Sequence, residues 1–374
     1  MVVVHAGVFA VGFVLVLSAL LSAIRTFVVP RGSPDTLTRA VFVAMRFIFD
    51  MPSRRQRPAA REQTLAFYAP VTLLTLPGLW LACVLAGYTA LYWALGAPSW
   101  GGAFTISRLS LLSLGSDTGN LPAAALVAFS ETVLSLLLVA ILVSYLPTIY
   151  SAFSQREAAV TGLETRAGSP PAPVAMLLRY HRIHGMEQIG DSWPKWQAWF
   201  EVVEESHTAL FPLIFYRSPQ PDRSWVTAAG AVLDTAALVA SSLDRPRDPA
   251  AELCIRAGYL CLQRIAHLVA IPYNADPAPT DPISVTRAEY DAVCDALAAA
   301  GVALKPDREQ AWRDFAGWRV TYDAVLVGLA VLIAAPPAPW SSDRVHHRRT
   351  GLGGPVKQAR AVAAALTAGR PLTE

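Results

Sequence analysis

Three long apolar runs dominate the first 150 residues. Residues 2–24 hold 23 uncharged positions, and residues 64–95 hold 32. As a helix rising about 1.5 Å per residue, the shorter run extends about 34 Å, which exceeds a hydrocarbon core of about 30 Å. A third run covers residues 122–150, and 53% of the whole chain is hydrophobic. The pattern predicts three transmembrane helices and excludes a purely soluble globular protein.

The first run is interpreted as a retained span, because it lacks the basic start and the small-residue cleavage site of a signal peptide. The loop that follows it, residues 25–63, contains eight arginines and three acidic residues. Since arginine-rich loops stay in the cytoplasm, this loop is expected inside a plasma or inner membrane. The N-terminus and residues 96–121 are then expected outside, and all residues after about Ser154 inside.

Part of this loop has the spacing of an amphipathic helix. Asp35, Arg39, Arg46 and Asp50 fall on one face at 100° per residue, and apolar residues occupy the other faces. The spacing predicts a helix that lies on the membrane with its arginines near lipid phosphates. A packed cytosolic helix with the same stripe is the alternative. Membrane lipids are thus the first expected partner, and the lipid-facing basic residues are Arg39, Arg46, Arg54 and Arg55.

The segment 103–120 is too short to cross the membrane and return as two helices, yet it is too apolar for an external loop. A re-entrant half-helix over about 103–113, followed by an extended strand, satisfies both facts. Irregular backbone at membrane depth is tolerated only where protein buries it or where it lines water. The segment therefore predicts a water-filled pathway, and the carbonyl end of the half-helix favours a cation there.

The order outer helix, short helix, hydroxyl-hydrophobe-glycine turn and inner helix resembles the pore module of the tetrameric potassium-channel superfamily. Ser113-Leu114-Gly115-Ser116-Asp117 stands where that family has Thr-Val-Gly-Tyr-Gly-Asp, and the resemblance covers about residues 36–157. It implies a homotetramer, because one pore segment per chain requires four chains. The selectivity filter that the resemblance implies consists of Ser113, Leu114, Gly115, Ser116, Asp117, Thr118 and Gly119.

The filter departs from the family at Ser116 and Asp117, where the family has an aromatic residue and a second glycine. Fewer glycines leave fewer positions at which the backbone can alternate its handedness to face the ion. Four copies of Asp117 would form a ring of carboxylates suited to cations generally. K⁺, Na⁺ and Ca²⁺ all remain open as the permeant ion, and a simple turn-capping role for Asp117 is the alternative.

Three further residues of this region are candidates for function. Arg108 and Glu131 are charges at membrane depth, which are costly unless they are paired or wetted. They are expected either to pair and brace the filter, or to leave Glu131 as a cavity-lining carboxylate. Pro147 lies in the third apolar run and is a candidate hinge or gate, because proline frees a backbone carbonyl. A helix end at the membrane interface would explain Pro147 equally well.

The pattern of the second half of the chain predicts helices, and Pro and Gly residues mark the loops between them. Five helices are expected, at 193–210, 224–242, 249–269, 285–300 and 308–334. The fold class is therefore an all-α membrane protein with three transmembrane helices, a re-entrant pore helix and loop, and a cytoplasmic helical bundle. The expected parts are a first transmembrane helix at 1–29, a basic loop at 30–63, a pore module at 64–157 with its pore loop at 103–120, a linker at 158–173, a helical domain at 174–340 and a basic, disordered tail at 341–374.

The sequence offers no catalytic constellation: no P-loop, no GxGxxG and no nucleophile elbow occur, so no enzyme is expected. No nucleic-acid recognition motif occurs either. Glu204 and His207 have the spacing of a di-iron motif, but the second such pair is missing, so no metal site and no cofactor are expected. The function expected is a cation channel with a cytoplasmic regulatory or assembly domain. A non-conducting, membrane-anchored helical sensor or scaffold is the alternative.

Overall fold

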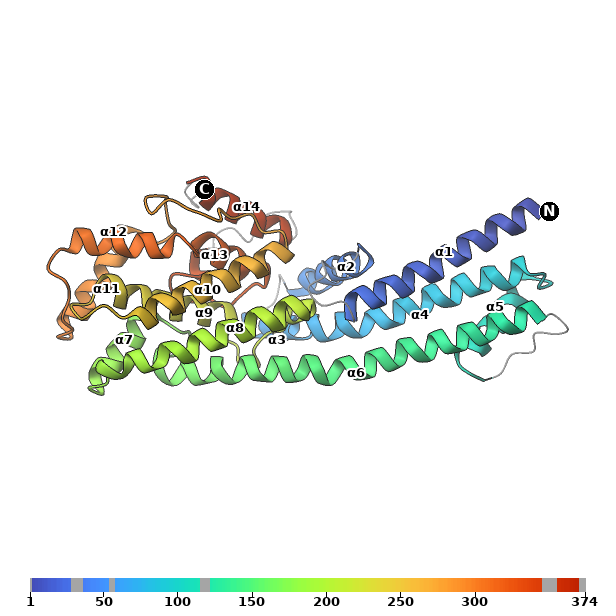
Figure 1. Cartoon of the computed structure of the whole chain (residues 1–374), viewed down its shortest axis with the longest axis horizontal. Coiled ribbons are helices and arrows are strands. Elements are labelled where there is room, and N and C mark those ends of the chain that lie inside the picture. Colours follow the sequence, from blue (N-terminus) through green and yellow to red (C-terminus); the bar gives the residue numbers. More distant parts are fainter. Residues whose placement is uncertain (1, 28–35, 54–57, 115–121, 345–354, 370–374) are drawn as a thin grey trace. The chain divides into compact units, whose positions relative to one another are not determined.

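The computed structural model describes residues 2–27, 36–53, 58–114, 122–344 and 355–369. Within these residues the chain is all-helical, with a few short 3-10 segments and no β-strand (Figure 1). The predicted all-α class is confirmed. The chain divides into two compact units, and each is described by itself. The first contains Met1–Pro52, Phe67–Ser151 and Ala209–Pro212, and the second contains Ser53–Ala66, Ala152–Thr208 and Leu213–Glu374.

Three helices are long and apolar enough to cross a bilayer. They are α1 (Val2–Phe27), α4 (Tyr68–Ala94) and α6 (Pro122–Ala167), and the apolar spans cover Val2–Phe27, Gln63–Ala94 and Ala123–Ala167. These are the three runs that the sequence predicts, so the prediction of three helices able to span a membrane is confirmed for the described residues. Their outward faces carry large exposed apolar side chains, among them Val11, Leu74 and Phe129.

In the first unit α1 and α4 lie side by side and antiparallel (Figure 1). The ring of His5 lies 4.7 Å from that of Trp93 at one end of the pair, and Trp80 Nε1 donates to Ser22 Oγ over 3.1 Å nearer the other. Between these contacts the two backbones cross at Gly12 and Gly87. A Cβ atom on Gly12 would lie 2.6 Å from the carbonyl oxygen of Gly87, so only glycine allows this close approach.

Two shorter helices complete the first unit. The amphipathic helix expected near residues 35–50 is α2 (Thr36–Ser53), and the short helix expected after α4 is α5 (Trp100–Leu111). α2 is attached to the spanning helices by polar contacts: Thr38 and Thr26 share a 2.8 Å hydroxyl bond, and Tyr68 Oη donates to the carbonyl oxygen of Phe42. This helix is therefore packed into the unit along one side.

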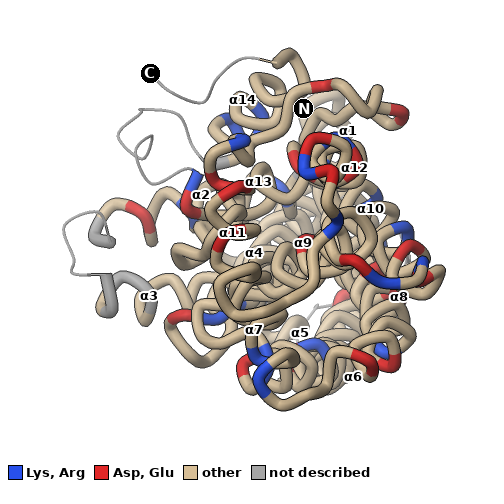
Figure 2. Tube along the Cα trace, turned by 90° about the vertical axis from the view of Figure 1, so that its left-hand side faces the viewer, with Lys and Arg blue, Asp and Glu red and all other residues tan. Residues whose placement is uncertain are grey.

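The second unit is built around α9 (Trp225–Ser241), which is buried along nearly its whole length. α7, α10, α12 and α13 pack against it. Charged residues are frequent on the helices around α9 (Figure 2). α9 itself carries a single charged residue, Asp234. The other helices of this unit are α3 (Pro58–Ala66), α7 (Pro173–Arg182), η1 (Glu187–Ser192), α8 (Trp193–Ala209), α10 (Pro249–Leu268), α11 (Arg287–Ala299), α12 (Arg308–Arg319), α13 (Asp323–Leu332) and α14 (Pro355–Thr367). The short segment η2 (Phe211–Phe215) includes residues of both units.

A buried ionic cluster joins three helices of this core. Arg319 of α12 donates through Nε to Asp323 Oδ1 over 2.7 Å, and its Nη1 contacts Asp234 of α9. Tyr322 Oη also donates to Asp234, over 2.8 Å. Both Arg319 and Asp234 have no solvent exposure. Because a buried charge is tolerated only with such partners, the cluster fixes the register of α9, α12 and α13.

The structure differs from the sequence predictions at three places in this half. α6 continues to Ala167, so residues 158–167 of the expected linker are helical. The expected helix at 308–334 is two helices, α12 and α13, bent by 52°. The expected disordered tail contains α14, which packs on α13 and buries Ala359, Val362, Ala363 and Leu366. These four residues recur at helical spacing, and burial on α13 stabilises the helix.

Candidate functional site

A buried carboxylate holds α5 against α4 and α6. Glu131 of α6 has no solvent exposure. Ser107 Oγ of α5 donates to its Oε1 over 2.5 Å, and Tyr92 Oη of α4 donates to its Oε2 over 3.0 Å. Each carboxylate oxygen therefore has one donor from a different helix. A buried polar group needs such partners, so the position of α5 depends on these bonds.

Further polar contacts surround this carboxylate. Thr132 Oγ1 of α6 donates to the carbonyl oxygen of Ser110 on α5 over 2.8 Å. The hydroxyl of Tyr92 lies 3.4 Å from Ser110 Oγ, and the hydroxyls of Tyr88 and Ser130 are 3.0 Å apart. All of these side chains belong to α4, α5 or α6. Together with Glu131 and Ser107 they form a polar brace at the junction of the three helices.

The local sequence explains why α5 presents this face. Ser99 caps the helix by accepting from the backbone nitrogen of Gly102 over 3.0 Å. Ser107 and Ser110 are three positions apart, so they share one face, and both are buried. Twelve residues of helix span only about 18 Å, which is too short to cross a bilayer. α5 is thus a short helix whose one polar face is fixed and whose other face, including Phe104, is exposed.

One of the two arrangements expected for Arg108 and Glu131, an ion pair between them, is not formed within the chain. Arg108 is exposed, and no ion pair joins it to Glu131, although the structure describes both residues. The reason is geometric: Ser107 and Arg108 are adjacent in α5 and therefore point about 100° apart, so only one of them can face α6. Glu131 does act as a brace, but its partners are two hydroxyl groups. Two serines three positions apart, beside an upstream tyrosine, are the signal that sequence reasoning missed.

The end of α5 leads into the predicted filter. Ser113 has a φ of +57°, its backbone nitrogen bonds the carbonyl of Ser110, and the nitrogen of Leu114 bonds that of Leu109. These two bonds form a Schellman motif, in which the left-handed position is usually glycine. Here a serine occupies that position. The remaining predicted filter residues, Gly115, Ser116, Asp117, Thr118 and Gly119, lie outside the described residues.

Pro147 lies inside α6, which continues as one helix on both sides of it. The proline side chain is exposed. The hinge hypothesis requires a proline inside a spanning helix, and Pro147 has that position.

The predicted lipid-facing arginines differ from one another in their surroundings. Arg39 is exposed on α2. Arg46 is buried: its Nε lies 3.2 Å from Asp50 Oδ2, and its guanidinium stands 5.3 Å from the centre of the Tyr68 ring. Arg54 and Arg55 lie outside the described residues. The exposed side of α2 is apolar and presents Val43, Phe47, Ile48 and Met51.

The weak metal motif of the second unit does not assemble. Glu204 pairs with Arg264, whereas His207 is buried and its Nε2 lies 3.2 Å from Arg156 Nη1. Burial and the neighbouring guanidinium hold the pKa of His207 well below its usual value. The described residues contain no group of three side chains suited to a metal ion.

Comparison with known proteins adds no family to this picture. No family model matches the chain. No curated protein and no solved structure matches it either. The likeness to potassium-channel pore modules therefore depends on the residues of segment 36–157 themselves.

Proposed function

We propose that this chain is the subunit of a homotetrameric cation channel, with α4, α5 and α6 as its pore module. The observation that carries the proposal is the short helix α5, which Glu131 and Ser107 fix between two helices of membrane-spanning length. Burying a carboxylate in such surroundings is costly. A brace of this kind fixes the end of α5, from which the proposed filter starts, in the same way in every copy, as a filter shared by four chains requires.

The ion preference of this channel follows from the residues after α5. Asp117 contributes one carboxylate per chain, and four carboxylates around an axis attract cations and repel anions. The polarity of α5 acts in the same sense, because the carbonyl end of a helix carries partial negative charge. The altered filter leaves K⁺, Na⁺ and Ca²⁺ as candidate permeant ions.

Assembly into a tetramer requires a face on each chain that meets its neighbours. α6 offers one, since Phe129, Leu136 and Val143 are exposed in the single chain and recur at helical spacing. Contiguous exposed apolar surface of this kind is covered by lipid or by another subunit. The inner helices of four copies would surround the axis, with Pro147 as the hinge of each.

The membrane surface is the second proposed partner. The positive-inside rule places the loop 25–63 and the second unit in the cytoplasm. The exposed apolar side of α2, with Phe47 and Ile48, is suited to the boundary between acyl chains and head groups, and Arg39 is suited to lipid phosphates. Arg46 already contacts Asp50 and Tyr68, so its role is to attach α2 to the first unit.

Two measurements test the channel. The mass of the purified protein in detergent should correspond to four chains, because neither a monomer nor a dimer can enclose a fourfold axis. Reconstituted into liposomes, the wild type should carry a cation flux that Asp117→Asn reduces or makes less selective. Asp222→Asn, an exposed carboxylate of the second unit, is the matched control and should leave the flux unchanged. A monomeric protein without flux would instead support the membrane-anchored sensor or scaffold.

A further inference from the structure

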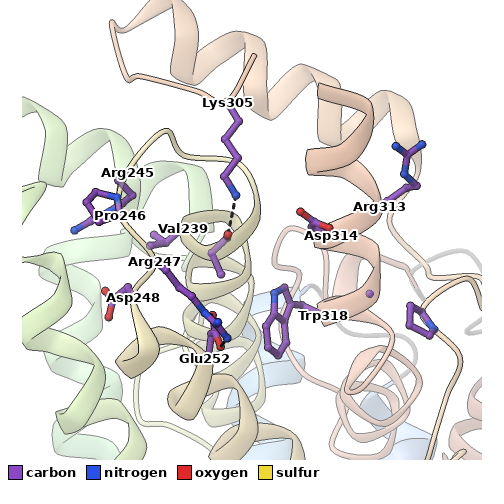
Figure 3. A pocket seen from close by; sticks show the side chains of 13 residues that line it. Val239, Arg245, Pro246, Arg247, Asp248, Glu252, Lys305, Arg313, Asp314 and Trp318 are labelled. Atoms are coloured by element: carbon purple, nitrogen blue, oxygen red, sulfur yellow. Dashed lines mark hydrogen bonds and ion pairs between the residues drawn. The ribbon is translucent and has the colours of Figure 1, made fainter. Parts of the chain in front are cut away.

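The second unit contains a cavity of about 550 Å³, of the size that small-molecule sites occupy. Its walls come from the end of α9, the loop leading into α10, the loop that carries Lys305, and α12 (Figure 3). This cavity is separate from the polar brace of α4, α5 and α6. All of its lining residues belong to the second unit.

Two cations in this cavity lack an acidic partner. Lys305 Nζ donates to the carbonyl oxygen of Ala240 over 3.1 Å, and Arg245 Nη1 donates to that of Met186 over 3.0 Å. Neither side chain forms an ion pair with any residue that the structure describes. Arg245 Nε is also buried without a hydrogen-bond partner in that part of the chain. Two cations without an acidic partner therefore line one cavity.

The carboxylates of the cavity are largely occupied. Glu252 accepts two bonds from Arg247, of 2.6 and 2.7 Å. Asp248 caps α10 by accepting from the backbone of Ala250, and it also accepts from Trp193 Nε1. Glu252 and Asp248 therefore leave Lys305 and Arg245 without an acidic partner, and an anion from outside the chain would supply one. An anion with about two charges, such as a phosphate monoester at neutral pH, has the required charge.

The side chains that α12 contributes to the cavity indicate which chemical group the phosphate carries. Trp318 is half-buried, and its indole meets no other aromatic side chain within the described residues. Asp314 lies one turn earlier on the same face and accepts from Gln310 through Oδ1. A flat ring that stacks on Trp318 would thus have a carboxylate oxygen beside its edge, ready to accept an N–H.

We propose that this cavity binds a mononucleotide-sized phosphate ester, with its phosphate on Arg245 and Lys305 and its nitrogenous ring on Trp318 and Asp314. The site belongs to the second unit and is measured by binding alone. The proposal therefore stands or falls separately from the proposed channel.

The test is calorimetric titration of the full-length protein in detergent with adenosine 5′-monophosphate. Adenosine and inorganic phosphate are the partial probes. The monophosphate should bind at least about tenfold more tightly than either part, because only it uses both ends of the cavity. Equal affinity for the monophosphate and for inorganic phosphate would overturn the assignment of the ring to Trp318, and no binding at millimolar probe would overturn the site.

Two variants test the phosphate end of the proposed site. Arg245→Met and Lys305→Met should each weaken binding of the monophosphate by about tenfold or more, since each loses a charge-assisted hydrogen bond. Lys195→Met, an exposed lysine of α8 outside the cavity, is the matched control and should keep wild-type affinity. Because Lys305 also bonds the end of α9, Arg245→Met provides a second variant that leaves that contact intact. Wild-type affinity in both variants would overturn the proposal.

Discussion

Ser107 of α5 donates its hydroxyl to the carboxylate of Glu131 of α6 over 2.5 Å, and neither side chain is exposed. This bond joins the short helix to the longest helix of the chain. Replacing Ser107 by alanine would leave Oε1 of a buried carboxylate without its donor. An unpaired buried acceptor costs about 1–3 kcal/mol, so Ser107→Ala should lower the thermal melting temperature of the purified protein. Ser144→Ala is the control, because Ser144 is exposed and donates only within its own helix. Equal melting of the two variants would mean that the bond contributes nothing.

The same bond separates the two roles considered for Glu131. Since the carboxylate is buried inside one chain and bonded by Ser107 and Tyr92, it acts as a brace. Glu131→Gln should therefore lower stability by about 1–3 kcal/mol while the folded fraction keeps its ion selectivity. Asp117→Asn should instead keep the stability of the wild type and reduce its ion selectivity. Melting curves and liposome flux measured on both variants check this. A selectivity change in Glu131→Gln at unchanged stability would instead favour a carboxylate that faces the ions.

The crossing of α1 and α4 depends on two glycines. A Cβ atom on Gly12 would lie 2.6 Å from the backbone oxygen of Gly87, and neither backbone can yield without separating the helices. Gly12→Ala should therefore destabilise the first unit by about 1–3 kcal/mol, the usual cost of overpacking. Gly7→Ala is the control on the same helix, because a Cβ atom there meets nothing within 4 Å. Comparable melting temperatures for the two variants would contradict the close crossing.

The spanning helices could be predicted from sequence because their signal is simple. An uncharged run of more than 20 residues is rarely anything other than a membrane-spanning helix. All three spanning helices begin close to the predicted residues, and α1 and α4 also end close to them, whereas α6 extends further. Several helix starts in the second unit could also be predicted, although those of α7, α13 and α14 were missed. Ser224 and Asp307 cap α9 and α12 as their residue types suggest.

The interaction partners of buried side chains could not be predicted from the sequence in the same way. Charge complementarity favoured Arg108 as the partner of Glu131, but a hydroxyl satisfies a carboxylate without bringing a second charge into an apolar region. The sequence signal for such partners, two serines three positions apart and an upstream tyrosine, is weak, because hydroxyl residues are common in membrane helices and most of them bond their own backbone. The helix α14 was missed for a related reason: Val362 and Leu366 become a stabilising face only once α13 is there to cover them. Interactions between distant segments decide both cases.

The turn after α5 contains a residue that is strained by its position. Ser113 occupies the left-handed position of the Schellman motif with a φ of +57°, where residues with a Cβ atom lose about 1–2 kcal/mol relative to glycine. Ser113→Gly should therefore raise the melting temperature, whereas Ser113→Val should lower it. Circular dichroism melts of the two variants check this. A lower melting temperature for Ser113→Gly would mean that the hydroxyl makes a contact worth more than the strain.

The pH dependence of the second unit should follow from His207. Its Nδ1 lies 2.8 Å from the carbonyl oxygen of Val203 and its Nε2 3.2 Å from Arg156, so the neutral ring donates at Nδ1 and accepts at Nε2. Burial and Arg156 hold its pKa well below the usual value. The unfolded chain then binds a proton below a pH of about 6.5 that the folded chain does not bind.

Stability should accordingly fall as the pH drops, by about 1.4 kcal/mol per pH unit below about 6.5, down to the folded pKa. Urea unfolding of the purified protein, followed by tryptophan fluorescence at pH 7.5, 6.5 and 5.5, measures this slope. His207→Gln should remove most of it, because glutamine does not titrate. His184→Gln, at an exposed histidine of the same unit, should retain the slope. If His207→Gln kept the full slope, other groups would carry the acid sensitivity, and the neutral buried ring would have no part in it.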